Sequence, residues 1–474
     1  MMKRWIAAWC LGLATITSPA ATATVVLPDV FSSGMVLQRD VPVPIWGQAP
    51  DGTALVVTFK DRDFTSTARN GRWKIILPAM DASAKASKLT VSGSDGFRKE
   101  LTDILIGDVW LASGQSNMEM QLRGAKTGEQ AIAASANPLL RFFTVSKKLE
   151  LVDGPLGDTW KVSGPATSPS MSAVAYFFAQ EIQQTQGIPV GLINCSYGGT
   201  VTETWCSPKT LAAGYPVWEA YEAKAKQNPK YARRNTSSRL YNRMLKTVMP
   251  FPVKGFLWYQ GEGNAGRAEE QKKLFPEMVK DWRQSWGNPK LPFYLVQLAR
   301  FEPATWHAFR LAQLDVWQNT PDSYLAVTID LSKDWKKDNH PIHPSTKAPI
   351  GHRLALAARA KVYGESELVY SGPIVRDIRI EKGKARLSFD HFGSGLAALD
   401  GKALRGFAVS GDGKQFVPGA AKIVGNVVLV SSPNITSPIA VRYGAELDMA
   451  KGKLDINLGN REKLPASPFT VFVR

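Results

Sequence analysis

The sequence is poor in the residues that most often bind metals. Its 474 residues include 3 cysteines and 5 histidines. Neither Cys195 nor Cys206 has a His or Cys neighbour at the spacing of a zinc site, so we expect no metal and no other cofactor. These two cysteines stand eleven positions apart, and whether they pair as a disulfide is left open.

Long apolar runs and basic clusters interleaved with aromatics are also lacking. Beyond the first residues, no segment reaches the roughly 20 apolar residues that span a bilayer, so membrane insertion is not expected. The net charge is +17, but without a basic and aromatic run it does not predict nucleic-acid binding. The charge favours an acidic polymer, an anionic glycan or an envelope surface as partner, or serves only solubility.

The first residues have the pattern of a cleavable export signal. Lys3 and Arg4 precede an apolar stretch over residues 5–16, and Ala21-Thr22-Ala23 offers a cleavage site. The apolar stretch is too short for a membrane anchor. We therefore expect residues 1–23 to be a signal peptide and the mature protein to be periplasmic or extracellular.

The remaining chain divides into three regions by its pattern of apolar and turn residues. Residues 24–105 alternate short β-type runs with turns, and Asn70-Gly71 between the runs 55–59 and 73–77 predicts a hairpin. Residues 369–474 again contain short β runs punctuated by Gly and Pro, which predicts a C-terminal β-sandwich.

Residues 106–368 have a different pattern, in which buried strands alternate with helices. The expected strands cover 108–112, 189–194, 254–259, 292–296 and 324–329. Helical patterns such as 174–186 and 271–286 lie between them. This alternation predicts an α/β domain with a three-layer α/β/α parallel sheet, flanked by N-terminal and C-terminal β domains. Reactive loops are then expected at the carboxyl ends of the strands.

Four of these loops contain residues suited to acyl chemistry. In Gly114-Gln115-Ser116-Asn117 a serine follows a strand and begins a helical stretch, although a helix-capping serine looks the same. Cys195 to Thr200 contains Gly198-Gly199, where a backbone can approach a ligand closely. Gln260 comes directly after a strand and can point its amide at a developing oxyanion, with Asn264 as the less favoured donor.

The fourth loop contains two of the five histidines. His340 and His343 are separated by a proline, which rules out the regular helix that would align them as a metal pair. A histidine in such a loop is suited to accept a serine proton. His307, His352 and His391 have no comparable setting, and we interpret each as a surface or packing residue.

Taken together, the four loops resemble the SGNH hydrolase superfamily, and within it the carbohydrate esterases grouped with sialate O-acetylesterases. The resemblance also includes residues 34–39, 107–118, 197–205 and 240–265, and Lys347, Gly351 and Arg353. It implies an SGNH-type domain over residues 106–368, Ser116 as nucleophile and His343 as base. It also implies an oxyanion hole made by the Ser116 N–H, Gly198 or Gly199, and the Gln260 side chain. Around these, we expect substrate contacts from Gln115, Asn117, Glu262, Asn264 and His340.

The chain departs from the family pattern at the acid that orients the histidine. The family's acid commonly lies two or three positions before the catalytic histidine, where this chain has His340 and Pro341. The candidates, in order of preference, are Asp338, Asp334, Asp330 and Glu262. A Ser–His dyad without an acid also stays open.

The resemblance implies removal of O-acetyl groups from a mono-, oligo- or polysaccharide. A sialate-type sugar suits the positive charge, and acetylated xylan or xyloglucan suits an exported enzyme equally well. The alternative from another class is a carbohydrate-binding protein with a catalytically dead site, supported only by the missing acid. Relatives carry a large insertion between the regions of Trp205 and Leu240, which is short here.

Overall fold

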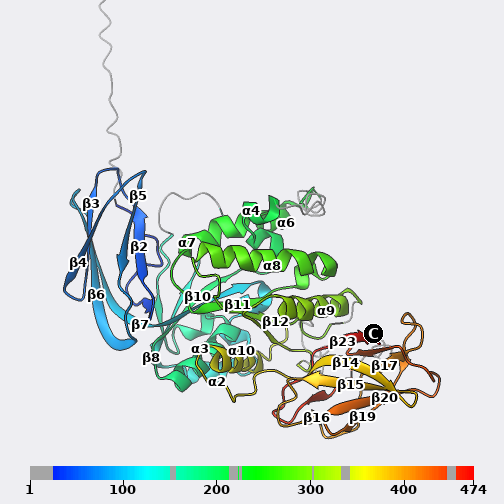
Figure 1. The fold of residues 1–474 in the computed structure, drawn as a ribbon. Coiled ribbons are helices and arrows are strands. Elements are labelled where there is room, and N and C mark those ends of the chain that lie inside the picture. The colour runs from blue at the N-terminus through cyan, green and yellow to red at the C-terminus, as the bar shows by residue number, and fades with distance from the viewer. Residues whose placement is uncertain are drawn as a thin grey trace, which may run out of the picture.

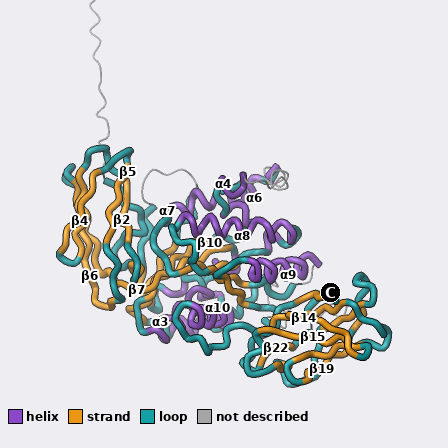
Figure 2. The backbone as a smooth tube through the Cα atoms, in the orientation of Figure 1, coloured by secondary structure: helices purple, strands orange, loops and turns teal. Residues whose placement is uncertain are grey.

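The computed structural model describes residues 25–149, 156–212, 222–223, 227–301, 304–331, 342–445 and 455–473. The predicted signal peptide lies outside these residues. A central α/β region is flanked by β structure formed by the two ends of the described chain (Figures 1 and 2).

The central sheet has six parallel strands in the order β13-β12-β11-β7-β10-β8. They are β7 (Arg98–Gly114), β8 (Asn137–Thr144), β10 (Val190–Ser196), β11 (Gly255–Tyr259), β12 (Phe293–Val296) and β13 (Ser323–Ala326). The antiparallel β9 (Lys161–Ser163) ends the sheet beside β8. The expected mixed α/β fold with a central parallel sheet is confirmed, and all five expected strands occur.

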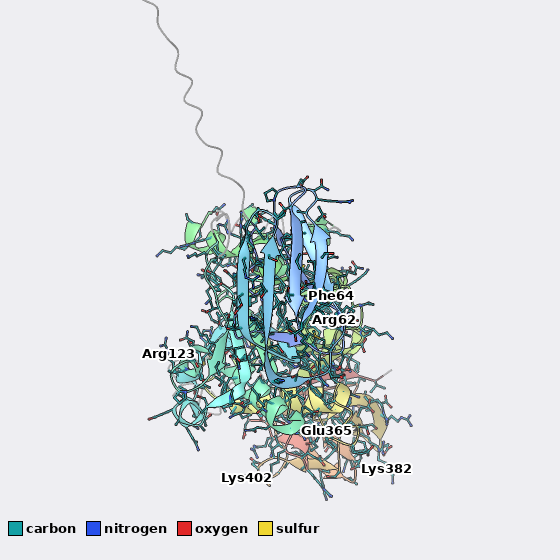
Figure 3. The ribbon with its side chains drawn as sticks, turned by 90° about the vertical axis from the view of Figure 1, so that its left-hand side faces the viewer. Arg62, Phe64, Arg123, Glu365, Lys382 and Lys402 are labelled. Carbon is teal, nitrogen blue, oxygen red and sulfur yellow. The ribbon has the colours of Figure 1, made fainter. Side chains whose placement is uncertain are left out.

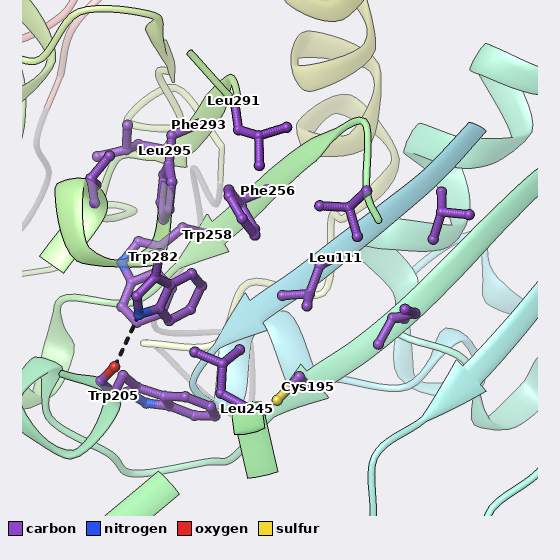
Figure 4. Close-up of a cluster of buried hydrophobic side chains, with 14 of the residues drawn as sticks. Leu111, Cys195, Trp205, Leu245, Phe256, Trp258, Trp282, Leu291, Phe293 and Leu295 are labelled. Atoms are coloured by element: carbon purple, nitrogen blue, oxygen red, sulfur yellow. Dashed lines mark hydrogen bonds between the residues drawn. The ribbon is translucent and has the colours of Figure 1, made fainter. Parts of the chain in front are cut away.

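Helices cover both faces of this sheet, because alternate residues of its strands point to opposite sides. Val109 and Leu111 face a core that includes Trp282 of α8 (Ala268–Ser285), the helix that packs beside α9 (Ala304–Asn319). Trp110 and Ala112 face a core shared with α3 (Ala173–Gln186) and α10 (Ala348–Lys361). Figure 4 shows the aromatic side of the first core, where the Trp282 indole donates to the Trp205 carbonyl at 3.1 Å.

The strand β7 belongs to two sheets at once. Its first half pairs with β6 (Ser83–Gly93), and β1 (Val36–Gln38) joins it at residues 105–107. Its second half is the middle of the central sheet. The pairing with β6 skips two residues of β7 near Asp103, which has a positive φ of 56°. Such a bulge bends a strand, and the Asp103 carboxylate is held by Arg141 of β8 at 2.6 Å.

The N-terminal β region differs from its predicted hairpin. The run at 55–59 is β3 (Ala54–Phe59), which pairs with β4 (Arg62–Thr67) and β6, whereas the run at 73–77 is β5 (Arg72–Leu77), which pairs with β2 (Val43–Gln48). Asn70-Gly71 does form a tight turn with two positive φ angles, but it connects β4 to β5 across two sheets. Arg69 and Arg72 form an antiparallel bridge on either side of this turn, as the Asn-Gly pair predicts, but the runs at 55–59 and 73–77 do not pair with each other, because the mostly exposed edge strand β4 lies between them in the sequence. Figure 3 shows Arg62 and Phe64 on β4, with the guanidinium 5.4 Å from the ring centre.

The C-terminal region forms two facing sheets, in agreement with the expected β-sandwich. One has the order β14-β15-β20-β19 and the other β18-β17-β21-β23, with Phe389 of β15 packed on Phe469 of β23. The strands are β14 (Ile374–Glu381), β15 (Lys384–Asp390), β16 (Leu396–Ala398), β17 (Phe407–Ser410), β18 (Val417–Pro418), β19 (Ala420–Val424), β20 (Val427–Ser431), β21 (Ala440–Tyr443), β22 (Leu458–Asn460) and β23 (Phe469–Phe472).

Short helical segments connect the larger elements. They are α1 (Ser116–Glu119), η1 (Leu122–Gly124), α2 (Gly128–Ala133), η2 (Ser168–Ser170), η3 (Thr202–Trp205), α4 (Pro208–Ala212), α6 (Pro229–Asn235), η4 (Tyr241–Leu245), α7 (Lys246–Val248) and η5 (Glu262–Asn264). Among the described residues no helix is long and apolar enough to cross a membrane. Cys195 and Cys206 are both buried free thiols, and burial raises the pKa of each.

Candidate active site

Ser116 lies where β7 ends and α1 begins. The turn into it requires glycine, because Gly114 has a φ of +129° and a Cβ there would come within 2.2 Å of the Tyr259 carbonyl. The Gln115 N–H donates to that same carbonyl at 2.9 Å, which ties the turn to the end of β11. Gln115 and Asn117 are buried, whereas Ser116 between them is half-buried and reaches solvent.

The structure brings Ser116 together with His343, which are 227 positions apart in the sequence. The Ser116 Oγ lies 2.6 Å from the His343 Nε2, a hydrogen-bonding distance. His343 lies in the loop that leads into α10. The residues predicted around it, Asp334, Asp338 and His340, lie outside the described residues. Asp330 is described, and both its oxygens accept hydrogen bonds from Arg353, at 2.8 and 2.6 Å.

The amides of Gln260 and Asn264 point into the protein. Gln260 Nε2 donates to the Thr200 carbonyl at 3.1 Å and to Asn264 Oδ1 at 2.7 Å, so both its hydrogens are engaged. Asn264 Nδ2 donates to Glu203 at 3.0 Å, and its oxygen also accepts from the Thr202 N–H. Both residues are at most 2% exposed. In this arrangement buried partners take up both amides, and the roles of Gln260 as an oxyanion donor and Asn264 as a substrate contact stay predictions.

The loop after β10 presents one free glycine N–H and one that is engaged. The Gly198 N–H donates to the Glu119 carboxylate, which also forms an ion pair with Lys147. Gly198 as an oxyanion donor stays a prediction, with its N–H engaged by Glu119 in this structure. Gly199 is exposed with a φ of +68°, and its carbonyl is held by Asn235 at 3.0 Å. Within the part of the chain that the structure describes, the N–H groups of Gly199 and Ser116 donate to no acceptor.

A cluster of buried polar side chains lies behind Ser116. Asn117 donates to the Glu262 carboxylate and to the Ile342 carbonyl, and accepts from Lys347 Nζ at 2.5 Å. Burial raises the pKa of Glu262 and lowers the pKa of Lys347 to about 7. Gln115 directs its side chain toward the Glu262 carboxylate. Asn117 is 1% exposed with its amide engaged by these partners, and its role as a substrate contact stays a prediction.

The other three histidines are surface or packing residues, as expected. His307 is buried on α9, and His391 packs beside Trp317 and Tyr370. His352 is exposed and contacts Glu181 at 2.7 Å. None of them lies in the cluster around Ser116. The described residues contain no group of three or more His, Cys, Asp or Glu side chains that could hold a metal ion.

Three residues near the site carried no separate prediction: Glu119, Lys147 and Lys347. Glu119 is part of the same short helix as Ser116, so its spacing from the serine was a usable signal. Lys347, four positions after His343, was named only as part of the family pattern. Lys147 lies three residues after β8, a strand that was not predicted, so nothing in the sequence connected it to this site.

Comparisons with known proteins agree with this architecture. The model of a carbohydrate esterase family, described as sialic acid-specific acetylesterase, matches residues 106–360, which is more than half of the chain. Human sialate O-acetylesterase is 29% identical over 403 residues, covering 76% of each chain. The mouse enzyme is 27% identical over 503 residues, covering 92% of each. A crystal structure of a carbohydrate acetylesterase from Xanthomonas citri has 37% identity and a TM-score of 0.83, and the match covers 94% of this chain and 99% of that one.

The parallel-sheet fold and these matches define a hydrolase of the carbohydrate O-acetylesterase class. Its substrate is accordingly an acetylated sugar. The chain belongs to the family of sialic acid-specific carbohydrate acetylesterases.

Proposed function

We propose that the chain removes O-acetyl groups by acyl transfer, with Ser116 as nucleophile and His343 as general base. The observation that carries the proposal is the 2.6 Å contact between Ser116 Oγ and His343 Nε2 at the solvent-facing end of β7. A hydroxyl this close to an imidazole nitrogen can pass its proton while its oxygen attacks a carbonyl.

The reaction proceeds in two half-reactions. Ser116 Oγ forms a bond to the acetyl carbon as its proton moves to His343 Nε2, and collapse of the tetrahedral intermediate breaks the ester bond. His343 returns the proton to the departing sugar oxygen. Water then attacks the acetyl-serine, again deprotonated by His343, and acetate leaves as Ser116 regains its proton.

The oxyanion that forms in each half-reaction is stabilised by backbone N–H groups. The donors we assign are those of Ser116 and Gly199, because both lack a described acceptor. Preorganised donors of this kind stabilise the transition state without reorganisation. Asp338 remains the proposed partner of the His343 imidazole.

For the substrate, we propose an O-acetylated sialic acid or a related carboxylated sugar. The mammalian relatives are named sialate O-acetylesterases, and the net charge of +17 favours an anionic sugar. We further propose that residues 1–23 direct the enzyme out of the cytoplasm. Acetylated xylan and xyloglucan fragments are the competing substrates.

The test combines Ser116→Ala with a substrate panel. Wild-type protein is expected to release p-nitrophenol from p-nitrophenyl acetate, and Ser116→Ala to lower turnover by at least about 10³-fold with an unchanged melting temperature. Acetate release is then measured on acetylated sialic acid, xylan and xyloglucan fragments. If Ser116→Ala keeps a tenth of the wild-type activity, the assignment of Ser116 as nucleophile is wrong. If the wild-type protein binds acetylated sugars without releasing acetate, it is a carbohydrate-binding protein.

A further inference from the structure

The amide of Asn117 joins the segments that carry the proposed nucleophile and base. Asn117 follows Ser116 directly, and its Nδ2 donates at 2.8 Å to the carbonyl of Ile342, the residue before His343. The same nitrogen donates to Glu262, and the oxygen accepts from Lys347. One buried side chain therefore contacts the loop after β7, the loop after β11 and the loop before α10.

Lys347 holds the oxygen end of this amide. In its charged form the lysine has three donors and no acceptor, so the atom of Asn117 that faces it is the oxygen. The nitrogen is then directed at Ile342 and Glu262, which both present acceptors. Without the lysine, Ile342 and Glu262 would still hold the nitrogen end, but the buried oxygen of Asn117 would lose its donor.

Keeping a lysine at this place is costly for the fold. Lys347 is 1% exposed, and its Nζ lies 5.2 Å from the centre of the Tyr259 ring, with Asn117 as its hydrogen-bond acceptor. Glu262 supplies the nearby opposite charge. Replacing a whole buried ion pair by apolar side chains of similar volume is often neutral or stabilising, so stability alone does not explain why Lys347 and Glu262 stand here as a pair.

We propose that Lys347 is a positioning residue, which acts through Asn117 and together with Glu262 to hold Ser116 Oγ against His343 Nε2. The inference rests on the proposed function, because it assigns a task in the reaction of the Ser–His pair. None of the three side chains touches the reacting atoms. Their effect is on geometry, and a misplacement of about 1 Å is enough to cost about 10²-fold in rate.

The experiment replaces Lys347 by methionine in the full-length protein and separates kcat from KM. Lys347→Met is expected to lower kcat on p-nitrophenyl acetate by about 10- to 100-fold, while KM stays near wild type. The rate at which paraoxon phosphorylates Ser116, followed by intact mass, is expected to fall in parallel, since it reports the same attack without the sugar site. The melting temperature is expected to fall as well, because Glu262 loses its nearby opposite charge, so both rates are measured well below it.

Lys254→Met is the matched control. Lys254 also lies over a tyrosine ring, 5.9 Å from the centre of Tyr363, and near a buried carboxylate, 3.8 Å from Asp108. It precedes β11 and so stands at the opposite end of that strand from Tyr259. We expect its kcat to remain near the wild-type value.

A double variant tests whether Lys347 acts through Asn117. Asn117→Ala with Lys347→Met is expected to be about as slow as Asn117→Ala alone, because the lysine then has no amide to orient. If Lys347→Met does not fold, Asn117→Ala is measured in its place, and the same loss of kcat at constant KM is expected. Wild-type kcat in Lys347→Met or Asn117→Ala, an equal loss in Lys254→Met, or multiplicative losses in the double variant would overturn the inference. Full activity of Ser116→Ala would instead overturn the proposed function.

Discussion

At the scale of single residues, the sequence located the Ser–His pair but not the direction of the amides around it. Ser116 and His343 stand out because each lies in a loop that follows an expected strand. Gln260 and Asn264 also follow a strand, but the sequence cannot show whether an amide turns outward or into the protein. The signal available in the sequence was the polar segment at residues 200–204, in which Thr202 and Glu203 supply the inward partners of these amides.

Gln260→Ala is expected to act mainly on stability. Removing the side chain leaves the Thr200 carbonyl and Asn264 without a buried donor, a loss of about 1–3 kcal/mol in the free energy of unfolding. Denaturant titration of the variant and wild type measures this loss. A drop in kcat of about 10²-fold at unchanged stability would instead show that Gln260 turns toward the oxyanion during the reaction.

The acid is tested by comparing two aspartates. Asp338→Asn is expected to lower kcat by orders of magnitude in a folded protein, because an amide favours the wrong tautomer of His343. Asp330→Asn instead weakens the pair with Arg353 and is expected to lower the melting temperature first. His340→Ala serves as the neighbouring control and should have a mild effect. If His340→Ala abolishes activity and Asp338→Asn does not, the assignment of the base or its partner is wrong.

At the scale of elements, apolar strands were predictable and polar or interrupted ones were not. The observed strands β11 and β12, expected at 254–259 and 292–296, are buried along their whole length, which makes them visible as continuous apolar runs. In contrast, β4 alternates exposed and half-buried polar residues, and β8 begins with Asn137-Pro138, so neither shows a strand pattern. Edge position and tertiary pairing, rather than local sequence, make these two segments strands.

A pH-dependent effect on stability is expected from α9. His307 is 6% exposed, and burial together with the nearby Arg310 and Arg442 lowers its pKa to about 3. Between about pH 3 and pH 6.5 the unfolded chain binds a proton there and the native protein does not, so the native state loses up to about 1.4 kcal/mol for each unit by which the pH falls. Urea titrations from pH 7 to pH 4 should show a smaller loss for His307→Leu than for wild type. Equal losses in both proteins would contradict this assignment.

At the scale of the whole molecule, the N-terminal β region and the central sheet share the strand β7. The sequence pattern suggested a domain boundary near residue 105, but that position lies inside the single strand β7. Hydrophobic pattern does not reveal such sharing, because both halves of β7 carry apolar residues. The bulge at Asp103 bends the strand between its two sheets.

A chain that begins at residue 106 is therefore expected not to fold. The truncation removes β6, β1 and the first half of β7, and exposes apolar residues such as Ile106 that they bury. The measurement is soluble yield and thermal unfolding of the truncated protein. A soluble, cooperatively unfolding and active fragment would show that the central sheet is independent. A chain lacking residues 1–23 is the control, and it is expected to melt like the full-length protein.

Because β7 is shared by two sheets, the number of residues between its bulge and the nucleophile is fixed. Between the bulge at Asp103 and Ser116 there is no linker that can lengthen, because residues 105–114 are all paired in a sheet. Inserting one residue into this stretch would exchange the two faces for every position that follows, so that Trp110 and Val109 would trade sides. Ser116 would then be presented away from His343. Insertions and deletions that preserve the reaction are therefore expected only in loops. The number of residues between Ile104 and Ser116 cannot change without moving the nucleophile.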